Sequence, residues 1–413
     1  MKLDINFIRE QYAVFRDADS AEWAFFENAG GSYIPDQVLK RFFNFLEYTK
    51  VQPYGLFPSS KEAGTAMDAG YQCIADLINA DGDDLTIGPS TTLNLYVLAQ
   101  AFRPSLKDGD EIIVTNQDHE ANIGNWRRLS EFGIVTKEWQ VDPQNGELNI
   151  DDLKLLISDR TRLVCFNLCS NIVGTLNDVK AITKLAHQFN ALAIADGVAF
   201  APHQIPDVNE LDVDVYLHST YKTFGTHLGV MWIKQSVMPK LYPQGHYFNA
   251  DKPHYNMNPT GPLHAEIAAL AGIGDYYDTI YEHQYGSTKL NRHDRAAKVF
   301  ELFVNHERRL SNLLLYTLKN IPNVRILGQS EATSGTRSGT ISFIPEGIKS
   351  SEVVKKLLEN QIAVRNGHFY VVRLIEALGI KDPDEGVVRI SLVHYNTEAE
   401  INRLCQGLKN IFT

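Results

Sequence analysis

The chain has 413 residues, of which 44% are hydrophobic and 22% charged, and its formal net charge is -11. This length suits one large and one small domain with a sizeable core, and the acidic balance argues against a nucleic-acid partner, because phosphate backbones are bound by concentrated Lys and Arg. The start of the chain lacks the basic-then-apolar pattern of a signal peptide and no apolar run is long enough to cross a bilayer, so the sequence predicts a cytoplasmic protein without a membrane span.

Short apolar runs alternate with helical patterns through the middle of the chain, as βαβ units require. Apolar residues at helical spacing predict helices at Thr92–Phe102, Asn122–Phe132 and Val179–Phe189, the last preceded by Asn177-Asp178 as an N-cap. These helices would cover the faces of a mostly parallel seven-stranded sheet. The strands predicted for this sheet are Leu85–Ile87, Glu111–Thr115, Val135–Val141, Arg162–Leu168, Ala191–Ala195, Val213–Leu217 and Gly229–Ile233.

The remainder of the chain indicates a long loop and a second domain. Tyr242–Pro262 is rich in Pro, Gly, Asn and aromatic residues, which predicts a functional loop, followed by a long helix. The later strands Val324–Leu327, Thr340–Ile344 and Val387–Ser391 lie among amphipathic helices, as in a smaller α+β domain. We therefore expect an α/β protein with a large domain at residues 20–288 and a small C-terminal domain at 289–413 that also includes residues 1–19.

The cysteines predict neither disulfides nor a metal site. Cys73, Cys165, Cys169 and Cys405 form no C-x-x-C pair and no disulfide-dense pattern. Cys165 and Cys169 lie in or beside an apolar strand, where a buried thiol behaves as a small hydrophobic group.

Polar residues follow several predicted strands, at the edge where an open parallel sheet binds ligands. Gly88-Pro89-Ser90-Thr91-Thr92 opens a helix and offers backbone N–H groups that suit a phosphate, although an ordinary helix N-cap has the same pattern. Asp118-His119-Glu120-Ala121-Asn122 would place an imidazole flat on an aromatic cofactor, and Ser170-Asn171 would bond a phenolic oxygen. Asp196 and Lys222 end the next two strands.

Lys222 and Asp196 together indicate a pyridoxal phosphate enzyme. Burial lowers the pKa of an ammonium group, and a lysine that forms a Schiff base needs a neutral amine. A carboxylate at a strand end can keep the pyridine nitrogen of the cofactor protonated, which makes the ring an electron sink. Alone, Lys222 would be a solvated surface lysine and Asp196-Gly197 an ordinary turn, so the interpretation depends on the whole set of strand ends.

Seven segments carry a family resemblance, namely Phe26-Glu27-Asn28-Ala29-Gly30-Gly31, Asp118-His119-Glu120-Ala121-Asn122-Ile123, Ser170-Asn171-Ile172-Val173-Gly174, Asp196-Gly197, Ser219 to Lys222, Val364-Arg365-Asn366-Gly367-His368, and Arg389-Ile390-Ser391-Leu392-Val393-His394-Tyr395-Asn396. In these segments the chain resembles the class V aminotransferase family of fold type I. The resemblance covers nearly the whole chain. It is strongest to the branch that contains cysteine desulfurases, selenocysteine lyases and isopenicillin N epimerase.

The resemblance implies the cofactor pyridoxal 5'-phosphate, an amino-acid substrate and a homodimer with active sites at its interface. Lys222 would form the Schiff base, Asp196 would pair with the pyridinium nitrogen, and His119 would stack on the ring. Arg389 would hold the substrate α-carboxylate, which a guanidinium fork suits. The further implied contacts are Asn171 to the ring oxygen, Val198 beneath the ring, Ser90, Thr91, Ser219, Tyr221 and Thr260 to the phosphate, and Asn28, Ala29 and Arg365 to the substrate.

Three positions depart from the family pattern. Tyr370 stands where desulfurases carry the cysteine that forms a persulfide, and a phenol is not an equivalent nucleophile. Ala199 stands where desulfurases usually have glutamine. Thr260-Gly261 reverses the Gly-Thr pair with which relatives reach the phosphate across the dimer interface, which weakens the assignment of Thr260.

These departures favour a carbon–sulfur lyase that works by β-elimination without a persulfide. Lys222 would remove the Cα proton, and Tyr370, Tyr54 or Tyr255 would serve as the acid for the leaving group or simply line the pocket. Transamination and epimerisation start from the same deprotonation and stay open as alternatives. A true cysteine desulfurase, or a binding protein that retains the fold without turnover, fits the sequence less well.

Overall fold

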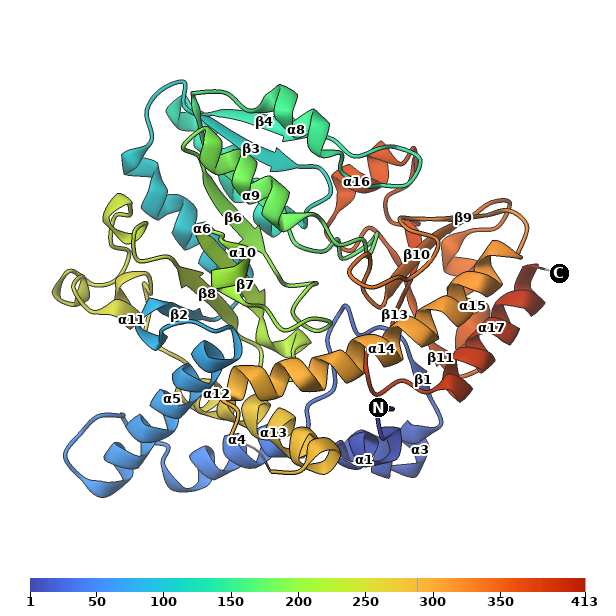
Figure 1. Cartoon of the computed structure of the whole chain (residues 1–413), viewed down its shortest axis with the longest axis horizontal. Coiled ribbons are helices and arrows are strands. Elements are labelled where there is room, and N and C mark those ends of the chain that lie inside the picture. The colour runs from blue at the N-terminus through green and yellow to red at the C-terminus, as the bar shows by residue number, and fades with distance from the viewer. Residues whose placement is uncertain (288, 413) are drawn as a thin grey trace.

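The computed structural model describes residues 1–287 and 289–412, and its largest element is a seven-stranded sheet (Figure 1). The strand order is β2-β8-β7-β6-β5-β3-β4. Neighbouring strands from β7 to β4 are parallel, whereas β8 is antiparallel to both β7 and β2. The predicted mostly parallel seven-stranded sheet is therefore confirmed. Its strands are β2 (Leu85–Gly88), β3 (Glu111–Thr115), β4 (Val135–Trp139), β5 (Thr161–Asn167), β6 (Leu192–Asp196), β7 (Val215–Ser219) and β8 (Gly229–Ile233).

Helices cover both faces of this sheet, because successive side chains of each buried strand point to opposite sides. In β5, Phe166 enters one apolar cluster and its neighbour Cys165 enters the other. The first cluster lies under α4 (Asp36–Tyr48), α5 (Pro58–Leu77), α8 (Ile150–Leu156), α9 (Val179–Gln188), α10 (Val208–Leu211), α12 (His264–Ala269) and α13 (Ala271–Tyr285). The second lies under α6 (Thr91–Phe102) and α7 (Gly124–Arg127).

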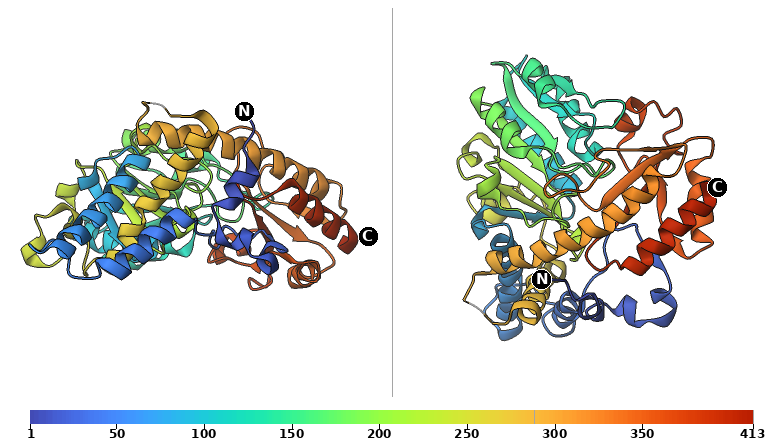
Figure 2. Two further views of the ribbon diagram at one scale, coloured as in Figure 1. Left: turned by 90° about the horizontal axis from the view of Figure 1, so that it is seen from below. Right: turned by 45° about the vertical axis from the view of Figure 1, so that its right-hand side comes forward.

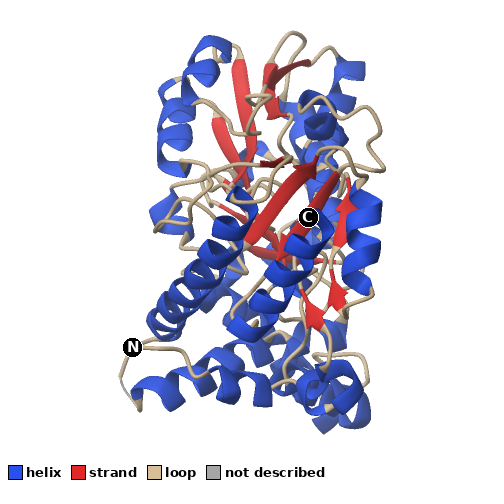
Figure 3. Cartoon of the chain, turned by 90° about the vertical axis from the view of Figure 1, so that its right-hand side faces the viewer, coloured by secondary structure: helices blue, strands red, loops and turns tan. Residues whose placement is uncertain are grey.

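A second, four-stranded antiparallel sheet lies in the C-terminal part of the chain, with the order β12-β13-β10-β9. Helices lie in front of its strands in Figure 3, and α15 and α17 supply apolar residues to its core. The predicted smaller α+β region is thereby confirmed. The elements of this part are β9 (Val324–Ile326), β10 (Thr340–Pro345), β11 (Ile362–Ala363), β12 (Arg365–Gly367), β13 (Val387–Ser391), α15 (Ser350–Leu358), α16 (Val372–Ala377) and α17 (Glu398–Phe412).

Two segments of the chain connect the region of the large sheet with the region of the small sheet. The 28-residue helix α14 (Arg292–Lys319) packs on α13 at one end and on α17 and β9 at the other (Figures 1 and 2). Near the N-terminus, α1 (Ile5–Glu10), α2 (Ala13–Arg16) and α3 (Ala18–Ala21) lead into β1 (Ala24–Phe25), which pairs in parallel with β11. The segment after β1 therefore lies against the C-terminal sheet. The domain boundaries at residues 20–288 and 289–413 stay a prediction.

The helix predicted at Asn122–Phe132 is wrong. The segment instead forms a 3-10 turn at Glu120–Asn122, the short helix α7 and a second 3-10 turn at Arg128–Phe132. The amide of Asn122 donates to Asp118 rather than facing solvent, and such local side-chain bonds compete with a regular helix.

The region after β8 also differs in detail from the prediction. The loop Tyr242–Pro262 contains the turn Tyr247–Asn249 and the short helix α11 (Pro253–Asn256), and the long helix expected after it is divided into α12 and α13 at Leu270. Among the residues that the structure describes, no helix has the length and apolar character needed to cross a membrane.

Candidate active site

The predicted strand-end residues meet in one pocket at the carboxyl edge of the large sheet, which we call the inner pocket. Asp196 is the last residue of β6, and Lys222 ends the 3-10 turn that directly follows the neighbouring strand β7. Because β6 lies between β7 and β5 in the sheet, these side chains converge with residues that follow β5. The inner pocket is lined by Thr91, Thr92, His119, Ala121, Asn167, Cys169, Asn171, Asp196, Val198, Ala199, Ser219, Tyr221 and Lys222.

Lys222 is a buried amine with a strongly altered acidity. Its pKa is lowered to about 8, chiefly by burial and also by the charge of Arg389, against the opposing effect of Asp196 and Glu27. The amine is therefore much closer to neutrality at physiological pH than a surface lysine would be.

Asp196 is held in place by its own backbone. One carboxylate oxygen accepts a hydrogen bond of 2.8 Å from the amide of Val198, and the residue also lines the inner pocket. Burial raises its pKa, while the Val198 bond and the charge of Lys222 lower it. A carboxylate in this setting favours a positively charged partner in the pocket.

His119 presents an uncharged ring to the inner pocket. Burial lowers its pKa to about 4, and the charges of Lys222 and Arg389 act in the same direction. Its Nδ1 accepts a hydrogen bond of 3.1 Å from the amide of Ala121, which fixes the orientation of the ring.

Beneath His119, the fully buried Asp118 bonds Thr115 and, at 2.8 Å, the amide of Asn122. Burial raises the pKa of Asp118 to about 8.

The hydroxyl-rich turn after β2 also contributes to the inner pocket, through Thr91 and Thr92. Ser90 is the N-cap of α6 and accepts a hydrogen bond of 3.1 Å from Leu93. The hydroxyl of Thr91 donates to the His218 carbonyl at 2.9 Å and lies 2.8 Å from the hydroxyl of Ser219. The N-terminus of the 12-residue α6 and these hydroxyls together form a typical anion-binding arrangement.

A wider pocket, which we call the outer pocket, opens from the inner one toward the small sheet and encloses about 400 Å³. The two share His119, Asn171, Tyr221 and Lys222. The other residues that line the outer pocket are Glu27, Ala29, Gly30, Arg365, Asn366, Gly367, His368, Phe369, Tyr370, Asp384 and Arg389.

Arg389 is the most buried charge of the outer pocket, with 3% of its side chain exposed. Its Nη2 lies 3.0 Å from Oε1 of Glu27, its Nη1 donates to the Asn171 carbonyl at 3.2 Å, and its Cζ lies 3.6 Å from the ring centroid of Phe369. Burial lowers its pKa to about 10, and Glu27 opposes this shift. The guanidinium thus remains charged at neutral pH and is fixed from three directions.

The loop that follows β12 closes over the outer pocket in an uncommon backbone conformation. Phe369 and Tyr370 have φ angles of 47° and 62°, a region that costs non-glycine residues free energy. The carbonyl of Phe369 accepts from the Asn171 amide at 3.2 Å, and the carbonyl of Tyr370 accepts from the Glu120 amide at 2.8 Å. The ring of Tyr370 lies 5.2 Å from that of His119.

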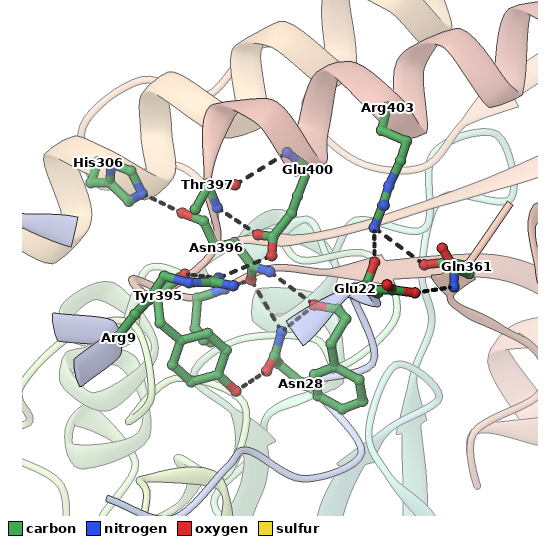
Figure 4. A network of polar contacts seen from close by, with 12 residues as sticks. Arg9, Glu22, Asn28, His306, Gln361, Tyr395, Asn396, Thr397, Glu400 and Arg403 are labelled. Carbon is green, nitrogen blue, oxygen red and sulfur yellow. Dashed lines mark hydrogen bonds and ion pairs between the residues drawn. The ribbon is translucent and has the colours of Figure 1, made fainter. Parts of the chain in front are cut away.

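Three predicted site residues do not line either pocket. Ser90 acts through the helix cap, and Thr260 lies exposed in the loop before α12. Asn28 is buried and bonds the Ser391 carbonyl at 2.8 Å and the Tyr395 hydroxyl, so its side chain ties the segment after β1 to the small sheet (Figure 4). Of the three residues predicted at the substrate besides Arg389, only Ala29 and Arg365 face the outer pocket.

Cys169 lines the inner pocket but has the properties of a structural thiol. It is buried, its Sγ lies 3.4 Å from the hydroxyl of Ser338, and burial raises its pKa to about 11. A thiol of this kind has very little thiolate at neutral pH and is a poor nucleophile.

The sequence did not reveal the roles of Glu27 and Phe369, which both contact Arg389, or of the buried Asp118, which bonds Thr115 and Asn122. Glu27 lies inside a motif segment, and a carboxylate there could have been expected to need a cationic partner. No sequence signal pointed to the stacking of Phe369 on the guanidinium.

Comparisons with known proteins show the family and the fold of the chain. A family model described as Aminotransferase class-V matches residues 24–404. The chain is similar to an aminotransferase-like protein of Gibberella zeae, with 34% identity over 94% of each chain, and to a cysteine desulfurase-like protein of Aspergillus flavus, with 30% identity over 100% of this chain and 91% of the relative. A solved structure of a C-DES variant with glycine covalently linked to its PLP cofactor has a TM-score of 0.78 at 18% identity and covers 97% of this chain and 98% of its own.

Proposed function

This chain belongs to the class V aminotransferase family of pyridoxal phosphate enzymes, and we propose that it is a carbon–sulfur lyase that eliminates a leaving group from the β-carbon of an amino acid. The observation that carries this proposal is the combination of Lys222, Asp196 and Arg389 around two adjoining pockets with Tyr370 on the loop after β12, where the resemblance to desulfurases would place their nucleophilic cysteine.

The residues of the inner pocket fit pyridoxal phosphate in four places. Lys222 offers a buried amine for the aldehyde, and Asp196 offers a carboxylate for the pyridine nitrogen. Thr91 and Ser219 offer hydroxyls at the N-terminus of α6 for the phosphate. Val198 and the uncharged ring of His119 would lie against the ring faces.

When bound, pyridoxal phosphate supplies an aldehyde that joins the substrate amine and a ring that withdraws electrons from Cα. Asp196 would hold a proton on the pyridine nitrogen. Arg389 would orient the substrate carboxylate, and the amine of Lys222, with its pKa near 8, would accept the Cα proton.

Tyr370 is the best placed of the three tyrosines considered as the acid for the leaving group. It lines the outer pocket beside His119 and is 68% exposed. Tyr54 instead donates its hydroxyl to Asp68 at 2.8 Å, and neither Tyr54 nor Tyr255 lines the inner or the outer pocket.

Among the described residues that line the inner and outer pockets, Cys169 is the one cysteine that a persulfide mechanism could use. Tyr370 carries no thiol, and Cys169 is buried with a raised pKa. These features support release of the sulfur fragment directly, together with an aminoacrylate that hydrolyses to pyruvate and ammonia.

Transamination is the second candidate, because the relative with 34% identity is named an aminotransferase-like protein. A panel of amino acids with β-leaving groups, scored for pyruvate, ammonia and the cofactor spectrum, separates the two reactions. Elimination produces pyruvate without consuming the cofactor aldehyde, whereas transamination accumulates pyridoxamine phosphate when no oxo acid is added. Pyridoxamine phosphate without pyruvate for every substrate would reject the lyase proposal.

A separate experiment tests whether Lys222 is the lysine that binds the cofactor covalently. Borohydride reduction and peptide mapping should place the cofactor on Lys222, and Lys222→Ala should abolish the label. A label on another lysine would reject the whole assignment of the inner pocket.

We also propose a homodimer in which a partner subunit covers the loop before α12. Large exposed apolar side chains at Tyr242, Tyr247, Phe248 and Leu263 support this arrangement, and Thr260 lies in the same loop. Light scattering should report a dimer, and Thr260→Ala should weaken cofactor binding if the partner's phosphate contact exists. A monomer that binds the cofactor fully would reject the proposal.

A further inference from the structure

The carboxylate of Glu27 lies where the site would bind the carboxylate of its substrate. Its Oε1 is 3.0 Å from Nη2 of Arg389 and 3.7 Å from Nη1 of Arg365. Both arginines and Glu27 line the outer pocket, which also contains Lys222. An oxygen between two guanidinium groups is the arrangement that an incoming carboxylate would require.

The backbone holds Glu27 in this position. Its Oε2 accepts a hydrogen bond of 2.8 Å from the amide of Gly30. A Cβ atom on Gly30 would lie only 2.3 Å from that oxygen, so the glycine leaves the room that the carboxylate occupies. Glu27 itself is 8% exposed.

Arg389 has limited capacity for two carboxylates. Nη2 already contacts Glu27 and Nη1 the Asn171 carbonyl, while Nε has no hydrogen-bond partner among the described residues. The two bidentate edges of a guanidinium are Nε with Nη2 and Nη1 with Nη2, so either edge includes Nη2, the nitrogen that already contacts Glu27. The second guanidinium, Arg365, is 69% exposed and can move with little desolvation cost.

We propose that Glu27 sets the affinity and charge preference of this site by competing with the substrate carboxylate for Arg389 and Arg365. The inference rests on the proposed function, because it takes Arg389 to be the carboxylate-binding residue. Two guanidinium groups and one glutamate leave a single positive charge. A single substrate carboxylate would therefore balance the charge of the cluster formed by Glu27, Arg365 and Arg389.

The burial of Arg389 determines whether removing Glu27 strengthens or weakens carboxylate binding. Removing Glu27 leaves the buried charge of Arg389 without compensation in the free protein, which is costly. A substrate carboxylate would then restore the lost partner, so Glu27→Gln should destabilise the free protein and strengthen carboxylate binding. A residue that only positioned Arg389 would have the opposite effect on binding.

The test compares L-alanine with L-alaninamide on the cofactor-loaded protein, with the cofactor absorbance as the measure of binding. Both probes carry the amine that displaces Lys222, but only alanine carries a carboxylate. In Glu27→Gln we expect the apparent Kd for alanine to fall by about tenfold, while the Kd for alaninamide stays unchanged. Glu27→Asp, whose carboxylate is withdrawn by one methylene, should change the alanine Kd in the same direction by less.

Glu400→Gln is the matched control. Glu400 also bonds an arginine with one oxygen, Arg9 at 2.9 Å, and a backbone amide with the other, Thr397 at 2.7 Å (Figure 4). Its side chain is 10% exposed, and it does not line the inner or the outer pocket. This variant should lose a comparable ion pair without altering the Kd of either probe.

Weaker or unchanged alanine binding in Glu27→Gln would overturn the inference. A wild-type spectrum that responds to neither amine would overturn the proposed function, and this inference with it. A normal wild-type response combined with an unchanged alanine-to-alaninamide ratio in Glu27→Gln would overturn the inference alone.

Discussion

Lys222 should make the stability of the cofactor-free protein rise with pH, relative to a variant that lacks its amine. Its pKa falls from the ordinary 10.5 to about 8 through burial. Between these two values the unfolded chain binds the proton and the folded chain does not, so stability from this group rises with pH across the window. Below about pH 8 both states carry the charge, and the folded state bears its full desolvation cost.

The expected change in the free energy of unfolding follows from the lowered pKa of Lys222. A fall from 10.5 to about 8 corresponds to about 3 kcal/mol, at about 1.4 kcal/mol for each pKa unit. Lys222→Met removes the titrating group and retains a side chain of similar length. The free energy of unfolding of the wild type, relative to this variant, should therefore increase by about 3 kcal/mol between about pH 7 and about pH 10.5.

Urea unfolding of the two cofactor-free proteins at several pH values provides the measurement. Lys234→Met is the control, because Lys234 is partly exposed and pairs with Asp212 at 3.0 Å. It should show no such increase. A constant difference between wild type and Lys222→Met across the window would refute the reasoning, since it would mean that the amine is solvated in the folded protein.

Three further outcomes are expected. Asp196→Asn should retain the cofactor but slow exchange of the substrate Cα proton with deuterated solvent by about a hundredfold, and near-normal exchange would exclude the electron-sink role. Gly229→Ala should weaken cofactor binding, because its Cβ would lie 2.3 Å from the carbonyl carbon of Ser90; Gly82→Ala, whose Cβ would meet only the side-chain oxygen of Gln72 at 3.7 Å, is the control, and equal losses in both would contradict this account. Incubation with cysteine should leave Cys169 without the adduct of about 32 daltons that marks a persulfide, so finding that adduct in step with alanine production would restore the desulfurase interpretation.

The residues of the inner pocket could be located from sequence because they depend on local pattern. In a parallel sheet every strand delivers its carboxyl end to the same edge, so finding the strands was enough to bring Asp196, Lys222, His119 and Asn171 together. The strands β3, β8 and β13 were predicted with their observed bounds. Their apolar runs end at clear turn residues.

The outer pocket was harder to predict because its contacts join distant segments. Glu27 and Arg389 lie 362 residues apart, and no periodicity relates them. The stacking of Phe369 on Arg389 depends on a left-handed backbone conformation at Phe369. Bulky aromatic residues rarely adopt this conformation, so conformational preferences do not predict it. The failed helix at Asn122–Phe132 has a related cause, since Asn122 is committed to Asp118.

The two pockets also differ in when a growing chain can complete them. Thr91 is the first residue of the inner pocket and Lys222 the last, so a little over half of the chain contains the whole of it. The outer pocket needs Glu27 from the beginning and Arg389 from near the end. During synthesis, which proceeds from the N-terminus, the ion pair between Glu27 and Arg389 can therefore form only after nearly every residue has been added, so the outer pocket is completed later than the inner pocket.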